Sequence, residues 1–349
     1  MYRLKSVPED FIVKEIISLP LGKSESGEYS YFLLQKKNLS TPEALSRIAE
    51  RLRLSVKFLG YAGNKDKTAV TEQFCSAKGI KKEILERVTL PNIKIAFQGY
   101  GPVPISLGNN RGNRFIIILR NLTKKETAKL EAVKNKTFFF PNYFDEQRFS
   151  KKNVEIGRCI IRKDFAQAVR LLQETEKDNS WMGEYLLKRK NDYLGVLRQF
   201  QKKILLLYIH AYQSFLFNNL ASICLKKRYP AVKTVRYSQG VFVFPSDIKK
   251  ETLSLPTVGF DTEVKNKQIK LLLQTVMKKE KLSFSDFIIR SFPELSQEGQ
   301  ERSLLTEAKE LSISQAEKDE LNPGKEKIII SFSLPKGSYA TMFIRFLLA

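Results

Sequence analysis

Residues 61–73 read YAGNKDKTAVTEQ, a charged loop between two apolar segments. The preceding segment, 56–61, is short and apolar, which is typical of a buried strand that enters a loop. After the loop, the β-branched and small residues of 70–77 predict a second strand. Between these two strands, Asp66 stands with a lysine on each side. The stretch therefore predicts a strand, a loop that presents one carboxylate, and a strand.

The chemistry of Asp66 follows from its two neighbours, Lys65 and Lys67. Nearby ammonium groups favour the ionised form of a carboxylate, so we expect Asp66 to be charged. A charged carboxylate suits a nucleophile or a general base and not a proton donor. In isolation, such an Asp is more often a turn residue that pairs with Lys65 for solubility. The loop is not a phosphate loop, because the pattern GxxxxGK[ST] is absent from the chain.

The rest of the N-terminal part alternates strand and helix signals. Thr41 is the expected cap of a helix, and Pro42 suits its first helical position. Many strands with few helices between them predict an α+β sheet domain. Strands are expected, from their β-branched and aromatic residues, at 11–16, 29–34, 93–99 and 114–120.

After residue 144 the pattern becomes mainly helical. Apolar residues recur at helical spacing in 164–175, 200–228, 264–281 and 300–311. Strand character returns in 327–334 and 338–348, on either side of a turn at 335–337. Strands that return after a helical middle predict an insertion into the sheet domain, with the last strands completing the sheet.

The composition points to a polyanionic partner. The 349 residues include 60 Lys and Arg against 37 Asp and Glu, a net charge of +23, and the surplus lies within residues 1–250. Such a field attracts nucleic acid, although solvated lysine-rich helices give the same total. No apolar run is long enough to span a bilayer, and acidic residues and Pro8 interrupt the N-terminus where a signal peptide would be apolar. We therefore expect a soluble cytoplasmic protein that is not a membrane protein.

Cysteine and histidine usage excludes several classes of protein. The three Cys residues form no CxxC pair, which argues against a disulfide framework or a Cys-based zinc finger. The chain has one His, His210, so a His-rich metal site or a Ser-His-Asp triad is not expected. These absences predict an activity that requires no metal and no cofactor.

Three further stretches contain candidate binding residues. In 111–115, Arg111 and Arg114 flank Asn113, and Phe115 follows at the start of a strand. The arginines suit phosphates and Phe115 suits an extruded base, although a core Phe is the commoner role. Residues 142–149 mix aromatic and polar side chains, Arg148 among them. Residues 337–345 alternate like a strand with Arg345 near its end, where it also suits a surface ion pair.

These stretches together resemble the TruD family of tRNA pseudouridine synthases. The signature is YAGNKDKTAVTEQ, and further blocks follow the order found in the family. Those blocks are LKSVPEDFIVKE, LGNNRGNRFIIILRNL, NYFDEQRF and GSYATMFIR, with AYQSFLFNNL in the middle. The resemblance covers essentially the whole chain. Two positions depart from the family pattern: Phe346 stands where an acidic residue is common, and Asp145 where Gly is common.

The resemblance implies a fold and a set of site residues. The implied fold is α+β, a pseudouridine synthase catalytic domain with a mixed, mostly antiparallel sheet, interrupted by a family-specific α+β insertion domain. The expected bounds are 1–150 and 325–349 for the catalytic domain and 151–324 for the insertion. Asp66 matches the catalytic aspartate and Phe115 an active-site aromatic. Supporting positions in register with the family are Asn113, Lys5, Glu9, Lys65, Gln73 and Arg345, and expected RNA contacts are Lys67, Arg111, Arg114 and Arg148.

The implied reaction is the isomerisation of uridine to pseudouridine in tRNA, at uridine-13. It breaks the bond between base and ribose, turns the uracil and rejoins it through carbon, and it needs no cofactor and no metal. The target nucleotide must leave its stack before a carboxylate reaches the sugar. We expect a monomer that binds tRNA. Two alternatives stay open: a non-catalytic tRNA-binding protein or chaperone of the same fold, and a synthase that acts on another RNA.

Overall fold

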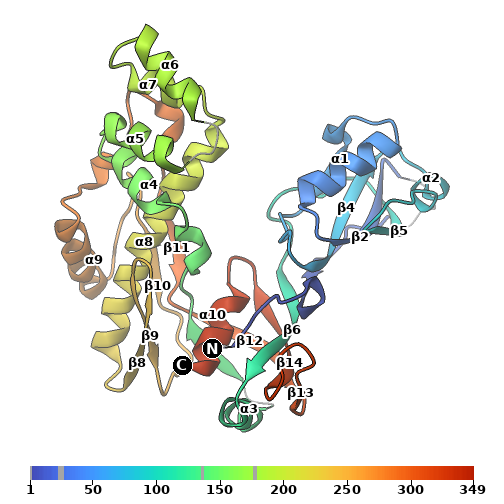
Figure 1. The fold of residues 1–349 in the computed structure, drawn as a ribbon. Helices are drawn as coiled ribbons and strands as arrows, with labels where there is room; N and C mark the ends of the chain where they lie inside the picture. The colour runs from blue at the N-terminus through green and yellow to red at the C-terminus, as the bar shows by residue number, and fades with distance from the viewer. Residues whose placement is uncertain (1, 23–26, 135–136, 176–178) are drawn as a thin grey trace. The chain divides into compact units, whose positions relative to one another are not determined.

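The structure is a computed structural model that describes residues 2–22, 27–134, 137–175 and 179–349 (Figure 1). Contacts within the chain divide it into two compact units. Unit 1 contains Met1–Phe138, Glu307–Ala340 and Leu348, and unit 2 contains Phe139–Thr306, Thr341–Leu347 and Ala349. The short strand β7 (Phe138–Pro141) takes the chain from unit 1 into unit 2.

Unit 1 is built on a sheet with the order β5-β2-β4-β1-β6-β14-β12. Its strands are β1 (Phe11–Ile16), β2 (Tyr29–Lys37), β3 (Leu59–Tyr61), β4 (Val70–Lys78), β5 (Ile93–Gly101), β6 (Gly112–Leu122), β12 (Leu305–Ile313), β13 (Glu317–Lys318) and β14 (Glu326–Pro335). Its helices are α1 (Thr41–Arg51), α2 (Lys82–Glu86) and α3 (Lys124–Glu131). The strands predicted in the N-terminal part and after the charged loop are confirmed. Before the loop, the strand predicted at 56–61 is confirmed only for Leu59–Tyr61, because Val56–Phe58 forms a 3-10 helix with exposed Val56 and Phe58 side chains.

The middle of this sheet joins the two ends of the sequence. β1 runs parallel to β4 and antiparallel to β6, and β14 lies antiparallel to β6 on its other side. Further antiparallel pairs are β2 with β4 and β5, β3 with β4, and β14 with β12 and β13. The prediction of an α+β fold with a mixed, mostly antiparallel sheet is confirmed, and β14 completes the sheet as expected.

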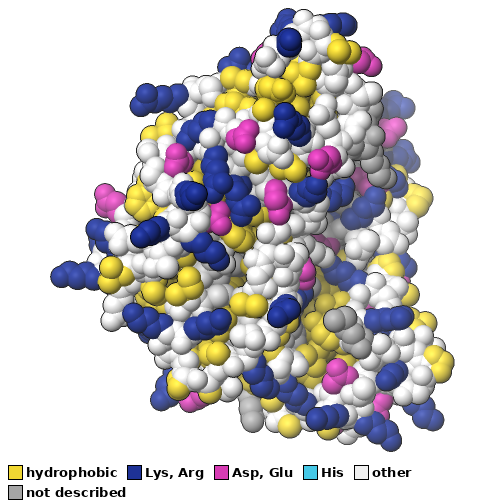
Figure 2. All heavy atoms as spheres, turned by 60° about the vertical axis from the view of Figure 1, so that its left-hand side comes forward, with side chains coloured by type: hydrophobic (Ala, Val, Ile, Leu, Met, Phe, Trp, Pro, Cys, Tyr) yellow, Lys and Arg dark blue, Asp and Glu magenta, His cyan; other side chains and the backbone are white. Residues whose placement is uncertain are grey.

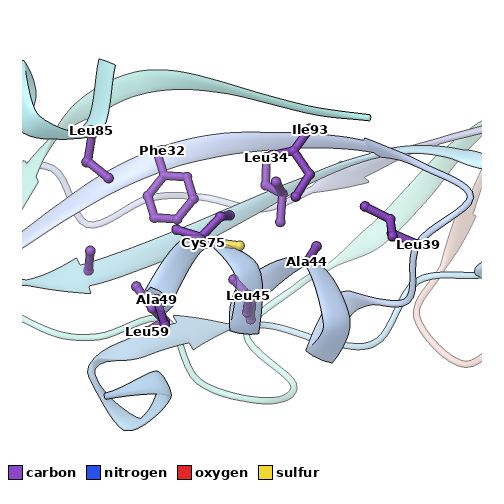
Figure 3. Packing of buried hydrophobic residues seen from close by; sticks show 12 residues of the cluster. Phe32, Leu34, Leu39, Ala44, Leu45, Ala49, Leu59, Cys75, Leu85 and Ile93 are labelled. Carbon is purple, nitrogen blue, oxygen red and sulfur yellow. The ribbon is translucent and has the colours of Figure 1, made fainter. Parts of the chain in front are cut away.

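Helix α1 covers one face of this sheet and fixes the position of the charged loop. Leu45 and Ala49 of α1 pack on Phe32 of β2 and Cys75 of β4, all fully buried (Figure 3). The helix begins one residue earlier than predicted, because its cap is Ser40, whose Oγ accepts from the Glu43 N–H at 3.3 Å. The hydroxyl of Thr41, the expected cap, is used elsewhere in the fold.

Unit 2 packs around one long helix, α8 (Lys202–Arg228), which is buried on several sides as a central helix is. The other helices are α4 (Asn153–Ile161), α5 (Phe165–Thr175), α6 (Ser180–Lys188), α7 (Tyr193–Arg198), α9 (Lys267–Lys279) and α10 (Ala340–Leu348). Its strands form the pairs β8 (Val232–Tyr237) with β9 (Gly240–Pro245), and β10 (Ser254–Thr257) with β11 (Gln300–Ser303). The helices predicted at 164–175, 200–228 and 264–281 correspond to α5, α8 and α9.

The helix predicted at 300–311 is wrong, because β11 and β12 occupy this segment. A bulge in β12 explains the misleading spacing. The register with β14 shifts between Lys309 and Ser312, and Glu310 has a positive φ of 54°. One extra residue in a strand puts Ala308 and Leu311 on the same buried side at a spacing of three, which imitates a helix.

The strand predicted at 338–348 is also wrong, because residues 340–348 form helix α10. The alternation ending at Arg345 is accidental. Ala340, Ile344 and Leu347 recur three or four residues apart and are all buried, which is the helical period. Arg345 therefore lies in the last turn of a helix and not at the end of a strand.

The domain bounds predicted at 150 and 325 stay a prediction, since the two units are defined by contacts alone. Among the described residues, no helix combines the length and apolar character needed to cross a membrane.

Candidate active site

The Asp66 carboxylate lies in the loop between β3 and β4, and an ammonium group from the N-terminal segment holds it. Lys5 Nζ donates to Asp66 Oδ2 at 2.6 Å. The Asp66 side chain is 49% exposed and that of Lys5 is 15% exposed, so the carboxylate is anchored on one side and open on the other. Lys5 has a φ of 59°, a left-handed conformation uncommon for a lysine. The expected ammonium partner of Asp66 exists, but it comes from 61 residues earlier in the chain and not from its neighbours.

A buried lysine holds the backbone of the same loop. Lys36 of β2 is 1% exposed, and its Nζ donates to the carbonyls of Leu39 at 2.6 Å and Asp66 at 2.9 Å. The Lys65 carbonyl lies at 3.5 Å, the outer limit for such a bond. Burial lowers the pKa of Lys36 to about 8, a shift that the nearby Asp66 charge opposes. The ammonium group therefore fixes the main chain at the residue that presents the carboxylate.

The flanking lysines point away from Asp66. Lys65 Nζ pairs with Glu15 Oε1 at 2.5 Å, and both side chains are almost completely buried. Glu15 Oε2 also accepts from the Phe74 N–H at 2.9 Å, so both of its oxygens have partners. Lys67 is exposed and lies 3.9 Å from Glu43. The sequence-based interpretation that Lys65 pairs with Asp66 is wrong.

Two buried polar side chains complete the support of the loop. Thr41 Oγ1 accepts from the Lys65 N–H at 3.0 Å and donates to Gln73 Oε1 at 2.8 Å. Gln73 Nε2 in turn donates to the Gly63 carbonyl at 3.4 Å. Thr41 and Gln73 are fully buried, so these bonds are shielded from water. The loop from Gly63 to Asp66 is therefore tied to α1, β2 and β4.

Aromatic side chains connect the carboxylate anchor to Phe115. Lys5 Nζ lies 4.2 Å from the centre of the Phe11 ring. Phe11 meets Phe115 edge to face at 6.1 Å, and Phe115 stacks on Phe332 of β14 at 5.5 Å. Phe115 is 7% exposed and belongs to this aromatic row. Its predicted contact with a base stays a prediction.

The same face of the sheet contains two buried polar atoms that lack a partner in the described part of the chain: Thr71 Oγ1 and Asn113 Oδ1. Asn113 of β6 lies opposite Glu15 of β1, and Thr71 of β4 lies opposite Val13 of β1. Side chains two residues apart share a face, so Thr71 lies on the face of Gln73, and Asn113 on that of Phe115. An unpaired buried polar atom is costly, which makes both atoms candidates for a ligand.

Several predicted residues of unit 1 do not contact Asp66. Glu9 pairs with Lys37 on the surface, and this ion pair lowers the pKa of the Glu9 carboxyl. Arg111 and Arg114 are exposed, and Arg114 lies 3.9 Å from Glu310. Arg114 is adjacent in sequence to Asn113 and Phe115, so it points to the opposite face of the strand. Phosphate binding by Lys67, Arg111 and Arg114 stays a prediction.

The other two predicted arginines belong to unit 2. Arg345 donates to Glu146 Oε2 at 3.2 Å and lies 5.3 Å from the Phe242 ring, so it takes part in an ion pair and in packing. Arg148 stands 5.8 Å from the Phe144 ring, and its Nε is buried without a partner among the described residues.

The remaining candidates for chemistry have structural surroundings. His210 of α8 shares a hydrogen bond with Gln297 at 2.9 Å, and burial lowers its pKa. Cys75 and Cys224 are buried free thiols whose pKa values burial raises. Within the described ranges, no group of three or more His, Cys, Asp or Glu residues is arranged to hold a metal ion.

Sequence analysis did not identify five residues as members of the site: Lys36, Glu15, Thr41, Phe11 and Phe332. The signal for Lys36 was present, because it continues the period-two series of Phe32 and Leu34 on the buried face of β2. A lysine at a core position of a strand requires partners and so indicates a built site.

Three comparisons with known proteins show which family the chain resembles. The model of the family "tRNA pseudouridine synthase D (TruD)" matches residues 2–182, 173–246 and 244–347. The probable tRNA pseudouridine synthase D 2 of Methanocaldococcus jannaschii is 31% identical, over 98% of this chain and 90% of that protein. The tRNA pseudouridine synthase D of Aquifex aeolicus is 28% identical, over 98% and 97%. The crystal structure of the putative tRNA pseudouridine synthase D from Methanosarcina mazei superposes with a TM-score of 0.72 at 26% identity, covering 99% of this chain and 93% of that one.

The family match and the likeness to this crystal structure show that the α+β fold is the pseudouridine synthase fold. The chain belongs to the tRNA pseudouridine synthase D (TruD) family, a family of isomerases that modify tRNA.

Proposed function

We propose that this chain converts uridine-13 of tRNA to pseudouridine, with unit 1 as the catalytic unit and the Asp66 carboxylate acting at the ribose of a flipped-out nucleotide. The supporting observation is that the Asp66 carboxylate is both anchored and accessible. Lys5 anchors one of its oxygens at 2.6 Å, and half of the side chain stays exposed to a ligand. The main chain around it is held by buried donors and acceptors, which pre-organises the carboxylate for reaction.

Asp66 serves either of two routes to the same product. In the first route it attacks the anomeric carbon and forms an ester as the uracil leaves, and the ring carbon then displaces the carboxylate. In the second it removes a ribose proton as the uracil leaves, and the proton returns to the ribose when the new bond forms. In both routes the bond from the base nitrogen to the ribose breaks, and a bond from a ring carbon replaces it. The carbon loses a proton and the freed nitrogen gains one, so the reaction needs no oxidant and no external group.

The buried polar atoms near the aromatic row provide a place for the uracil. Asn113 Oδ1 accepts and Thr71 Oγ1 both donates and accepts, which matches the N–H and carbonyl groups of the base. Phe115 stands between Phe11 and Phe332 on the same face, where a flat ring finds aromatic surface. The two atoms lie on the strands that flank β1, so a flipped base on this face would satisfy one of them.

The test compares two isosteric variants. Asp66→Asn keeps the shape of the side chain and removes the nucleophile or base, so we expect pseudouridine formation to fall at least about a thousandfold, about 4 kcal/mol in the barrier. Asp247→Asn changes the charge equally at an exposed position of unit 2 and is expected to leave turnover unchanged. Pseudouridine is mapped in unmodified tRNA after incubation with each protein.

The pattern of outcomes separates the proposal from its alternatives. Modification at position 13 by the parent and its loss in Asp66→Asn support the proposal. Tight tRNA binding without isomerisation by the parent identifies a non-catalytic tRNA-binding protein. Modification only in another RNA corrects the substrate, and near-normal turnover by Asp66→Asn removes Asp66 from the catalytic role.

A further inference from the structure

Unit 2 contains a cavity of about 820 Å³ next to helix α6, outside the site built around Asp66. Its lining includes Trp181 and Tyr185 of α6, Phe200 in the segment before α8, and Ile204 in the first turn of α8. Figure 2 shows hydrophobic side chains exposed at the top of the molecule, where Figure 1 places α6 and α7, with Lys and Arg side chains around them. Leu187 of α6 is 86% exposed and belongs to the same region.

Three aromatic rings of this cavity offer flat surface to a ligand. Trp181 and Phe200 are in contact at 5.4 Å between ring centres, with 53° between their planes. The Arg189 guanidinium lies 5.4 Å from the Tyr185 ring, and the Tyr185 hydroxyl donates to Asp192 at 2.8 Å. The side chains of all three, Trp181, Tyr185 and Phe200, are partly exposed, so they remain accessible to a ligand. Such faces are suited to stacking with an unpaired base.

The rim of the cavity is basic. Lys188 and Arg189 line it, and Lys202 and Lys203 lie between two further lining residues, Gln201 and Ile204. None of Lys188, Lys202 or Lys203 forms an ion pair with a described residue. The two lysines of α8 occupy its first turn, where the helix dipole disfavours cations, so local helix stability does not account for them. The acidic member of the lining, Glu184, suits an exocyclic amine of a base.

We propose that this cavity binds one unstacked nucleotide of single-stranded RNA, with the base against Trp181 and the neighbouring phosphates against the lysines of the rim. The inference rests on the proposed function, because the RNA that reaches the cavity is the substrate RNA. It adds a second nucleotide site in unit 2. A protein ligand is disfavoured, since the charge around the aromatic rings matches a polyanion.

The chain provides its own probe for this proposal, because Trp181 is the single tryptophan of the sequence. The full chain is titrated with an oligoribonucleotide of about eight adenylates, and tryptophan fluorescence is followed. We expect saturable quenching, since a base stacked on the indole quenches it. An abasic RNA backbone of the same length provides the same phosphates without bases and is expected to leave the fluorescence nearly unchanged.

Two double variants, each of which removes two positive charges, test the basic rim. Lys202→Ala with Lys203→Ala removes the lysines beside the cavity and is expected to raise the quenching midpoint about tenfold. Lys226→Ala with Lys227→Ala removes the pair near the other end of the 27-residue helix, about 36 Å away, and is expected to leave the midpoint unchanged.

The proposal is overturned if the adenylate oligomer does not quench, if the abasic RNA quenches equally, or if the two double variants behave alike. The Asp66→Asn variant separates this result from the proposed function. It is expected to retain the full quenching curve while it forms no pseudouridine. Quenching without isomerisation by the parent would remove the proposed function and keep the nucleotide site.

Discussion

Unit 1 contains two groups of buried charged side chains, and they hold different parts of the chain. In the first group, Arg120 of β6 binds Asp10 at 2.8 Å and Asp319 at 2.9 Å, and all three are almost completely buried. In the second, Lys65 binds Glu15 while Lys36 binds the carbonyls around Asp66. The first group joins segments close to the two ends of the sequence, and the second supports one loop.

The difference between the groups lies in what their charges satisfy. Arg120 meets carboxylates, and although burial opposes its charge, the hydrogen bonds that it donates to Asp10 and its other acidic partners raise the pKa of Arg120 overall. Lys36 meets only backbone carbonyls, and burial lowers its pKa to about 8. The paired charges around Arg120 stabilise the fold. Burying the Lys36 charge without a carboxylate partner instead costs free energy of folding. We infer that the cost is accepted because Lys36 positions the carboxylate of Asp66.

The largest effect is expected where the network around Arg120 is broken. Arg120→Met leaves Asp10 and Asp319 buried without a counter-charge, so we expect the free energy of unfolding to fall by about 3–5 kcal/mol. Urea denaturation measures it. Arg114→Met, on the same strand, removes a half-exposed pair and is expected to change stability by at most about 1 kcal/mol. Equal losses in the two variants would show that burial of the Arg120 network does not matter.

The aromatic row of Phe11, Phe115 and Phe332 lies between the two groups. Phe115→Leu tests whether Phe115 serves the reaction or only the stability of the fold. Leu keeps much of the buried volume and loses the flat ring. Stacking on a base is worth about 1–3 kcal/mol, so we expect a melting temperature close to the parent's and a single-turnover rate lower by about 5- to 150-fold.

Phe97→Leu on β5 is the matched control for Phe115→Leu, because Phe97 packs on the core beneath α1, away from the row. Its turnover is expected to stay at the parental level. A Phe115→Leu variant that turns over normally, or whose loss of rate follows its loss of stability, would return Phe115 to the core.

Much of unit 1 is predictable from local patterns. Period-two alternation locates β1, β2 and β6, and the loop with Asp66 stands out because a Lys-Asp-Lys triplet interrupts two apolar segments. The errors arise where one local period imitates another. The bulge at Glu310 gives β12 a helical spacing, and the short helix α10 happens to alternate.

The partners of the site residues are less predictable, because they depend on which strands meet. The Lys5–Asp66 pair spans 61 residues and the Lys65–Glu15 pair spans 50, and no local pattern contains such a distance. The hydroxyl of Thr41 illustrates the point. The sequence suggests a helix cap, yet the fold uses this group for the Lys65 N–H. Local chemistry identifies the functional residue types, and tertiary structure assigns their partners.

A smaller effect is expected for the lysine that supports the Asp66 loop. Lys36→Met removes the donor to the Asp66 carbonyl and also removes a buried charge, so we expect turnover to fall about tenfold without a loss of stability. Lys37→Met is the control, since Lys37 is adjacent, lies on the other face and pairs with Glu9 on the surface. Single-turnover rates and urea midpoints are measured for both. A loss of stability equal to that of Arg120→Met would show that Lys36 stabilises the fold and does not act by positioning Asp66.

The smallest and most specific effect is the pH dependence that Lys36 confers. Its pKa is about 8 in the folded chain and about 10.4 in an unfolded one, so between these values the unfolded chain binds more protons. The contribution of Lys36 to the free energy of unfolding therefore rises as the pH increases through this range. Turnover should change in the opposite direction, because a neutral amine has fewer hydrogens for its carbonyl partners.

Asp66, Lys65 and Glu43 are the charged groups that act on Lys36, and the cysteines titrate over the same range in the unfolded chain. The difference between the parent and Lys36→Met removes their contributions. We expect this difference to show stability rising and turnover falling from about pH 7.5 to 9.5, and a parent whose two profiles match those of Lys36→Met would exclude the positioning role.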